Sequence, residues 1–563
     1  MDLKQLQQSL KEQKIDACII TRNNQFIGQD ILPEENRIAQ LCGFDGSAGK
    51  MIIFQDKALL FTDGRYALQA PLQTQGTGVE VIITKGESLG SWMQKNLNDK
   101  QQRIAYNPWC HTISETDYWK RTLRNLTFIE NEELLAAPLS NINKCDIFEH
   151  DIEYAGISMD EKISQFTKFM QDNHLDGFII TACDSVSWLL NLRSDCLPDC
   201  PIIRAFAFIN SNGEVSLFTN DFRKLESELQ NYKNKNIGMD CKHSPSAIFR
   251  IMKKHKIWIE NILDPIQNWK AIKNPVELSN IQKAHLKDAR AVTRFLIWLE
   301  QNYSGQTELD IINKLNEYRQ QEQNYFANSF ATIAGFAQNG AIVHYHPTET
   351  TNLTLHSGSL LLLDSGAQYF DGTTDITRTI AIGTPTPEMI HNYTIVLKSH
   401  IALASCYFPE GTNGAALDAI ARAPLWKHGK DYAHGTGHGV GYFLNVHEGP
   451  CSISSRNGNI SLAEHMITSI EPGYYKENHY GIRIENLAQV IRIEDNNFEQ
   501  STLGFEPLTL VPLDKRLIDK YLLNKDELAW LNNYHQTIFN KLSPLMNEQE
   551  KIWLEQACTP IEI

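Results

Sequence analysis

The sequence has no long apolar run, and its basic side chains are fewer than its acidic ones. No run of apolar residues approaches the roughly 20 that a membrane-spanning helix needs, and the first residues lack the apolar core of a signal peptide. The 52 Lys and Arg residues stand against 67 Asp and Glu residues, for a net charge of −15. Because such a surface repels phosphate groups, we expect neither a nucleic-acid nor a membrane partner, and we expect a cytoplasmic protein.

The cysteines do not follow the pattern of a disulfide-rich protein. The chain has 11, an odd number, and they are scattered along it. Only Cys196 and Cys200 lie close in sequence, and no second pair stands nearby to complete a zinc site. We therefore expect reduced thiols in this loop and a reducing compartment.

The first half of the chain contains a faint internal duplication. Residues 15–21 resemble residues 175–181, and residues 60–63 resemble residues 217–220 at a similar offset. Each copy is predicted to form short buried strands. The duplication indicates two related α/β domains, and a coincidence between ordinary strands is the alternative.

Three domains are predicted, at residues 1–150, 151–271 and 272–563, since 563 residues exceed one hydrophobic core. The first boundary lies in the polar stretch around residues 140–155. The third domain begins near Pro275, which suits the first turn of a helix that runs to about Asn302. The last 60 residues are predicted to be helical.

Two aspartates flank a pair of short strands in this third domain. The apolar run at residues 360–363 ends in Asp364, and a turn signal, Asp371-Gly372, precedes a strand that starts at Asp375. Neighbouring strands joined by a short turn can bring Asp364 and Asp375 to one point.

Two glutamates follow further along the chain. Glu471 lies in the segment Ile470-Glu471-Pro472-Gly473, and Glu485 alternates with two isoleucines in the segment Ile482-Arg483-Ile484-Glu485. Because side chains alternate along a strand, Arg483 and Glu485 are predicted to share one face and the isoleucines the other. The acidic face would then line a cavity.

A glycine-rich segment with two histidines lies between these acidic pairs. The segment is His434-Gly435-Thr436-Gly437-His438-Gly439-Val440-Gly441, with four glycines in eight residues, which argues against a helix. Glycines instead allow the backbone to pass close to a ligand while a histidine is held at the right height.

Four inward carboxylates would repel one another and raise their pKa values unless cations balance them. Two divalent metal ions would cancel this charge. Carboxylate oxygens with one imidazole favour manganese, with zinc and cobalt as alternatives. Two such ions roughly 3.5–4 Å apart can share one water and lower its pKa to about 7, which suits amide hydrolysis.

These motifs resemble the metal-dependent aminopeptidases of the pita-bread fold, and most closely the three-domain cytosolic aminopeptidase P family. The resemblance covers nearly the whole chain and is carried by residues 43–49, 62–66, 339–345, 364–369, 372–379, 434–441, 505–510 and 530–535. It implies an α/β (α+β) fold class, with two creatinase-N-like α/β domains followed by a pita-bread metallopeptidase domain and a C-terminal helical extension.

The resemblance also implies the metal ligands. Asp364 would be a terminal ligand of one metal, and Asp375 and Glu485 would bridge both. His438 and Glu471 would complete the second metal, and Glu471 would also orient or deprotonate the bridging water.

The remaining site residues are likewise implied by the resemblance. His344 and His447 would hold the scissile carbonyl and the developing oxyanion. The residues assigned to the proline side of the cleft or to support of the ligands are His434, Val446, Tyr475 and Arg483.

The activity implied is hydrolysis of the N-terminal Xaa-Pro bond by attack of a metal-bridging hydroxide. The partners implied are peptides with proline in second position and a second copy of the chain, since the family forms homodimers largely through the third domain. Two alternatives remain: a prolidase acting on Xaa-Pro dipeptides, and an inactive pita-bread module that binds peptides or proteins.

Overall fold

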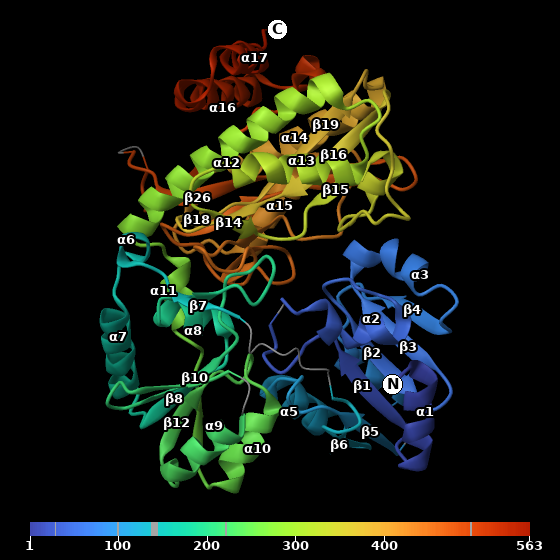
Figure 1. Cartoon of the computed structure of the whole chain (residues 1–563), viewed down its shortest axis with the longest axis vertical. Coiled ribbons are helices and arrows are strands. Elements are labelled where there is room, and N and C mark those ends of the chain that lie inside the picture. The colour runs from blue at the N-terminus through green and yellow to red at the C-terminus, as the bar shows by residue number, and fades with distance from the viewer. Residues whose placement is uncertain (29, 98–100, 137–144, 220–221, 496–497, 563) are drawn as a thin grey trace. The chain divides into compact units, whose positions relative to one another are not determined.

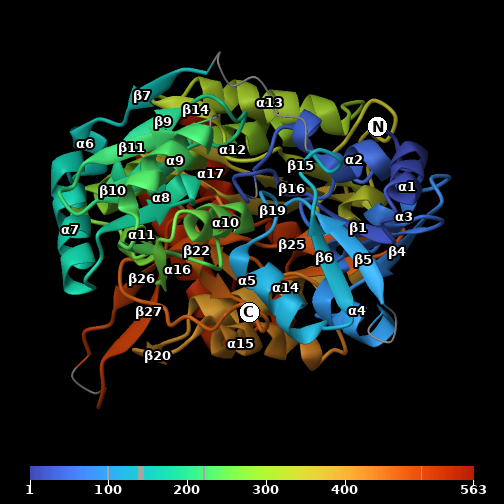
Figure 2. The same ribbon diagram turned by 90° about the horizontal axis from the view of Figure 1, so that it is seen from below.

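The computed structural model describes residues 1–562 except residues 29, 98–100, 137–144, 220–221 and 496–497. Contacts divide the chain into two units. The first comprises residues 1–151, 157–197 and 202–266, and the second comprises residues 152–156, 198–201 and 267–563. Figures 1 and 2 show the elements of both units. Within the described part of the chain, no helix combines the length and the apolar character needed to cross a bilayer.

The first sheet of unit one has six strands with helices on both faces, in the order β4-β3-β2-β1-β5-β6 (Figure 1). Every residue of β1 is buried, because Cys18 and Ile20 pack in one apolar cluster with α1 while Ala17 and Ile19 pack in another with α4. Burial on both faces explains the unbroken apolar run in the sequence. The elements are α1 (Leu3–Glu12), β1 (Ala17–Thr21), α2 (Arg37–Cys42), β2 (Lys50–Phe54), β3 (Ala58–Thr62), α3 (Gln69–Gln73), β4 (Val79–Ile83), α4 (Leu89–Leu97), β5 (Gln102–Tyr106), α5 (Ile113–Thr122) and β6 (Leu126–Glu130).

The second sheet of unit one has five strands, in the order β11-β10-β8-β12-β13. Its central strand β8 pairs antiparallel with β10 and parallel with β12, as β1 pairs antiparallel with β2 and parallel with β5. This shared pairing confirms the interpretation of two related α/β domains. The elements are α7 (Met159–Asp172), β8 (Gly177–Ile180), α8 (Cys183–Leu189), β10 (Phe206–Asn210), β11 (Val215–Phe218), α9 (Phe222–Leu229), β12 (Asn236–Met239), α10 (Ser246–Lys254) and β13 (Trp258–Asn261). Residues 140–144 of the predicted boundary stretch lie outside the described residues.

The expectation of reduced thiols in the Cys196–Cys200 loop is wrong for Cys196, which forms a disulfide with Cys145. Strand β7 (Ile147–Glu149) pairs antiparallel with β9 (Leu192–Ser194), and Ile147 lies opposite Ser194. This pairing, continued by two residues, brings Cys145 beside Cys196. The sequence spacing of 51 residues hid the pair because only strand register brings it together.

Unit two contains curved antiparallel sheets covered by long helices. Its helices are α6 (Ile152–Ala155), α11 (Ile266–Ala271), α12 (Pro275–Asn302), α13 (Glu308–Gln320), α14 (Pro387–Ala404), α15 (Gly414–Trp426), α16 (Lys525–Leu542) and α17 (Glu548–Cys558). Its strands are β14 (Tyr325–Asn328), β15 (Ile333–Phe336), β16 (Ser359–Ser365), β17 (Ala367–Tyr369), β18 (Gly372–Thr373), β19 (Ile376–Ile382), β20 (Phe408–Pro409), β21 (Gly437–Gly439), β22 (Glu448–Ile453), β23 (Ile467–Ile470), β24 (Gly473–Lys476), β25 (Tyr480–Arg483), β26 (Asn486–Arg492) and β27 (Thr502–Pro507).

Four sheets of unit two surround the site. They are β14-β17-β18, β15-β16-β19, β24-β25 and β20-β27-β26-β23-β21-β22. Helices α12 and α13 lie side by side and contact β18 and β15, respectively (Figure 1). All seven residues of β16 and all seven of β19 are buried, so both strands are covered on each face and cannot shift register without exposing apolar side chains.

The predicted helix from Pro275 to about Asn302 is confirmed as α12, whereas the described part of the last 60 residues is α-helical only in α16 and α17, because β27 extends to Pro507. Asn274 caps α12 by accepting from the backbone of Glu277, and Pro275 occupies the first turn, where its missing N–H costs nothing. Near the end of the chain, Leu531 and Tyr534 are the buried face of α16.

Candidate metal centre

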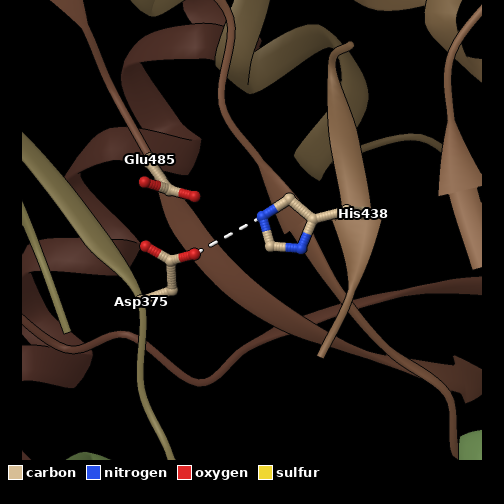
Figure 3. A group of neighbouring side chains, drawn as sticks. All are labelled: Asp375, His438 and Glu485. Atoms are coloured by element: carbon tan, nitrogen blue, oxygen red, sulfur yellow. Dashed lines mark ion pairs between the residues drawn. The ribbon is translucent and has the colours of Figure 1, made fainter. Parts of the chain in front are cut away.

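Three side chains of unit two converge from separate segments of the chain, as Figure 3 shows. Asp375 directly precedes β19, His438 lies in β21, and Glu485 follows β25. One ligand atom of each lies within 4.8 Å of those of the other two. His438 Nε2 is 3.4 Å from Asp375 Oδ2. Asp375 and Glu485 are each less than 5% exposed.

The two aspartates are positioned by the pairing of β16 and β19. Asp364 lies opposite Thr377 in this pairing, and Asp375 stands two residues before Thr377. The predicted turn at Asp371-Gly372 is confirmed, since Gly372 pairs with Tyr369 across a two-residue connection. Asp364 lies outside the three-residue group and binds Arg483, whose Nη2 is 2.6 Å from Asp364 Oδ2.

The segment around Glu485 differs in part from its prediction. Strand β25 ends at Arg483, and pairing resumes with β26 at Asn486, so Glu485 lies between two strands. Arg483 and Glu485 nevertheless point the same way, because both contact Thr377. Thr377 Oγ1 donates to Glu485 Oε2 at 2.7 Å and accepts from Arg483 Nε at 3.2 Å. Ile484 is fully buried in the apolar core, as the alternation predicts.

The glycine-rich segment, which is described throughout, contains a short strand and no helix, and its composition had argued against a helix. A Cβ atom at Gly437 would stand 2.0 Å from the carbonyl oxygen of Ser469, and one at Gly439 would stand 2.2 Å from that of Glu448. Only glycine therefore allows β21 to pack this closely on both neighbours. His438 is held at the centre of this contact, and its backbone N–H donates to Ser469 Oγ at 2.9 Å.

Glu471 lies next to the three-residue group, directly after β23. Its Oε1 is 3.6 Å from His438 Nε2 and accepts a hydrogen bond from Ser469 Oγ at 3.3 Å. Its backbone N–H donates to Thr436 O at 2.8 Å, which fixes the end of β23 against the histidine segment. We call Asp364, Asp375, His438, Glu471 and Glu485 the carboxylate cluster.

The acids of the carboxylate cluster are hard to ionise together. Burial, followed by the charges of Asp364 and Glu471, raises the pKa of Asp375 well above its usual range. Burial and the neighbouring carboxylates act in the same direction on the pKa of Glu485. Burial also raises the pKa of Glu471, against the opposing effect of His438 and Arg483.

These observations fit the binding of cations. The Oδ1 atoms of Asp364 and Asp375 are buried and have no hydrogen-bond partner among the described residues. Four carboxylates surround one imidazole, and Arg483 is the cation that contacts Asp364. Oxygen-rich sites with one imidazole suit hard or borderline divalent ions. Buried acceptors without donors are costly, and metal coordination would satisfy them.

The residues assigned to substrate lie beside the cluster and bind one another. His434 Nε2 is 2.8 Å from Tyr475 Oη, which accepts from Arg483 Nη1 at 2.5 Å. Burial raises the pKa of Tyr475 to about 12, so its hydroxyl stays neutral near pH 7. His434, Tyr475 and Arg483 therefore form one chain of hydrogen bonds that ends at Asp364.

His447 and His344 border this group from two further segments. The rings of His447 and His438 have centroids 4.3 Å apart, and His447 is exposed. Val446, the residue before it, is buried. His344 is half-buried and follows Val343, whose carbonyl oxygen accepts from Arg483 at 3.4 Å.

Three supporting residues escaped the sequence analysis. Thr377 links Glu485 to Arg483, and its place two residues after Asp375 on a strand was a usable signal. Arg422 holds the histidine segment through His434 O at 2.7 Å, and nothing near it in sequence marks this role. Glu308 accepts from Tyr345 Oη at 3.0 Å and so anchors the segment that carries His344.

A curved antiparallel domain that carries such a cluster is typical of a metallopeptidase. The family model for metallopeptidase family M24 matches residues 279–492, and that for the C-terminal region of peptidase M24 matches residues 501–561. Creatinase/prolidase N-terminal domain models match residues 3–137 and 140–237. The chain belongs to metallopeptidase family M24.

Relatives with known names match the chain over nearly its full length. Aminopeptidase P1 of Lotus japonicus is 33% identical, covering 98% of this chain and 97% of its own. Xaa-Pro aminopeptidase 1 of Dictyostelium discoideum is 34% identical, covering 99% and 96%.

A solved structure matches over the same extent. It is the X-prolyl aminopeptidase of Caenorhabditis elegans, a cytosolic enzyme with a di-nuclear active site. It is 30% identical, covers 97% of this chain and 95% of its own, and has a TM-score of 0.91. The two-domain-plus-pita-bread architecture is thereby confirmed.

Proposed function

We propose that the chain is a two-metal aminopeptidase that removes the N-terminal residue of peptides with proline in second position. The observation that carries this proposal is the convergence of Asp375, His438 and Glu485 within 4.8 Å, flanked by two further carboxylates. The full-length similarity to aminopeptidases P supports the substrate class.

The ligand assignment rests on the resemblance to the family and is supported by the convergence of these side chains. Asp375 and Glu485 would each hold both of two divalent cations. Asp364 would complete the ligands of one metal, and His438 and Glu471 would complete those of the other. Manganese is proposed, with zinc and cobalt as alternatives, on the oxygen-rich donor set. When bound, the two cations would polarise the scissile carbonyl and lower the pKa of a shared water.

The other side chains would then position and move protons. Glu471, whose pKa burial raises, suits the role of a base that accepts a proton from the attacking water near neutral pH. His447 and His344 would donate hydrogen bonds to the carbonyl oxygen as its negative charge develops.

The proline side of the cleft would be formed by His434, Val446, Tyr475 and Arg483. A proline nitrogen carries no hydrogen, so recognition needs an apolar shape rather than an acceptor. Burial of Val446 and the fixed Tyr475 ring support such a pocket.

The inactive-module alternative would require missing ligands, whereas all five donors of the carboxylate cluster are present. Prolidase remains the second candidate among enzymes. The prolidase of Thermococcus sibiricus shares the fold at a TM-score of 0.51 and 22% identity, but covers only 64% of this chain. That likeness shows the fold alone.

One assay separates the two enzymes. Purified protein with manganese is incubated with Arg-Pro-Pro and, separately, with Gly-Pro. We expect release of arginine from the tripeptide while the dipeptide is spared. The reverse result supports prolidase, and cleavage of neither peptide supports the binding module.

We further propose that the protein is cytoplasmic, and the whole-length likeness to a cytosolic relative supports this compartment. We also propose domain boundaries at residues 150/151 and 271/272. On the resemblance to the family, we propose a homodimer built largely by the third domain. Sedimentation should give about twice the 64.1 kDa of one chain, and a single-chain mass would refute the dimer.

A further inference from the structure

A second buried charged group lies in unit two, where two lysines contact one glutamate. Lys273 Nζ donates to Glu448 Oε1 at 2.9 Å, and Lys270 Nζ lies 3.1 Å from Glu448 Oε2. The side chains are at most 1% exposed. We call these three residues the lysine cluster. Two lysines and one glutamate thus meet in a buried place, and buried charges of this kind are costly unless they are held in good geometry.

The lysine cluster contacts both carboxylate oxygens of Glu448, by a hydrogen bond from Lys273 and an ion pair with Lys270. Lys273 Nζ also donates to Lys270 O at 2.8 Å, so the two lysines are fixed to each other. Lys270 lies in α11, Lys273 stands two residues after its end, and Asn274 then caps α12. Glu448 is thereby tied to a rigid part of the domain.

Glu448 is the residue directly after His447. Its backbone pairs with Gly439, the residue after His438, and Gly439 has no room there for a side chain. The backbone of Glu448 is thus held by pairing with β21, and its side chain is held by the two lysines. The result is a fixed attachment point for His447, whose ring faces that of His438 at 4.3 Å.

An exposed side chain takes its position from the backbone that carries it. His447 is exposed, so the packing that orients a buried ring acts on only part of it. Displacement of a catalytic group by about 1 Å can lower turnover about 100-fold. Anchoring of the next residue is therefore an effective way to keep His447 in place.

We propose that Lys270, Lys273 and Glu448 are positioning residues that hold His447 over His438. This inference rests on the proposed function, in which His447 binds the scissile carbonyl. Loss of the lysine cluster should lower kcat, leave KM nearly unchanged and leave both metals bound.

The first test is Lys273→Met, which keeps the ion pair of Lys270 with Glu448, so folding should persist. We expect kcat on Arg-Pro-Pro to fall about 10-fold or more, a typical loss for residues that orient a ligand shell, with KM within about 2-fold. Lys273→Arg, which keeps the charge and a donor, should restore most of kcat.

The matched control is Lys398→Met. Lys398 also binds one carboxylate, Glu527, at 2.5 Å and one carbonyl, that of Leu522, at 3.0 Å, but it joins α14 to α16. We expect it to leave kcat within about 2-fold. An equal fall of kcat in both variants, or a fall that tracks metal loss measured by mass spectrometry, would overturn the proposal.

A double-mutant cycle shows whether the lysine cluster acts through His447. In a His447→Ala background, Lys273→Met should cost less than about 2-fold in kcat, because the group that it positions is gone. The same 10-fold cost in both backgrounds would contradict the proposal. That outcome leaves the proposed function intact, because wild-type cleavage of Arg-Pro-Pro is measured separately.

A crystal structure of Lys273→Met gives a readout independent of activity. We expect the ring of His447 to move away from that of His438 or to lose order, while the carboxylate cluster keeps its geometry. An unchanged and equally ordered His447 would overturn the proposal even if no peptide were cleaved.

Discussion

The carboxylate cluster and the lysine cluster are two groups of charge in the same unit. The first is partly exposed at His438 and Glu471, and the second is almost fully buried. In the first, four acids face one histidine and Arg483, and two buried carboxylate oxygens have no partner among the described residues. In the second, one acid is held by two lysines at 2.9 and 3.1 Å. The comparison teaches that an excess of buried acceptors marks a place for cations, whereas a charge already balanced by side chains marks a support.

The largest expected effect comes from removing Asp375, an acid that we propose to hold both cations. Asp375→Asn keeps the shape of the side chain but removes its negative charge and replaces one ligand oxygen with an NH2 group. We expect kcat to fall by at least about 10³-fold, because electrostatic stabilisation of the reaction depends on that charge. Steady-state hydrolysis of Arg-Pro-Pro measures the loss.

The matched control for this variant is Asp371→Asn. Asp371 is also buried, lies four residues away and binds Lys287 at 2.6 Å. It should keep kcat within about 10-fold. A similar loss in both variants would show that Asp375 matters for folding rather than for ligation.

The next effect concerns stability and distinguishes the two clusters directly. Glu448→Gln leaves two buried lysines without their acid and should lower the free energy of unfolding by roughly 3–5 kcal/mol. Asp375→Asn should instead raise the stability of metal-free protein, since it removes a repelling charge. Urea unfolding of both variants in chelator measures this difference. If Asp375→Asn destabilised the protein as much as Glu448→Gln, the contrast between the clusters would be lost.

A smaller effect is expected from the hydroxyl that supports Glu485. Thr377→Val keeps the volume of the side chain but removes the contacts to Glu485 and Arg483. We expect kcat to fall about 10–100-fold, as for other residues that orient ligands, and Thr377→Ser to stay near wild type. Peptide hydrolysis at saturating manganese tests this, and equal rates for Val and Ser would contradict it.

The smallest effect is a trend with pH. Burial raises the pKa values of Asp375 and Glu485 in the folded chain above the usual value of about 4. Between that value and the raised ones, the metal-free folded state holds more protons than the unfolded state, so its stability falls as pH rises.

Asp375→Asn removes one of the two carboxyl groups that hold these extra protons in the folded state. In chelator, the stability of the variant relative to wild type should therefore increase with pH in this window, by up to about 1.4 kcal/mol per pH unit. Thermal unfolding at several pH values measures it. A difference that is constant or falls with pH would show that Asp375 ionises freely in the folded chain.

Local sequence patterns predicted much of the fold and of the site. The strand before Asp364, the turn at Asp371-Gly372 and the Pro275 helix start each depend on a few neighbouring residues, and all are confirmed. The glycine-rich segment was predicted not to be a helix. In the structure, a side chain at Gly437 or Gly439 would collide with the backbone of a neighbouring strand.

Features that depend on distant contacts could not be predicted in this way. The bond between Cys145 and Cys196 follows from the register of β7 and β9. The lysine cluster joins residues 175 positions apart. Glu485 was expected within a strand, but strand pairing changes at that point, which no local alternation of apolar residues reveals.

The most direct test of the account is the location of bound metal in crystals of manganese-loaded protein. Anomalous scattering should show two peaks roughly 3.5–4 Å apart, both contacted by Asp375 and Glu485, with Asp364 at one and His438 and Glu471 at the other. A single peak, or peaks away from these side chains, would contradict the central claim that the carboxylate cluster is a two-metal site.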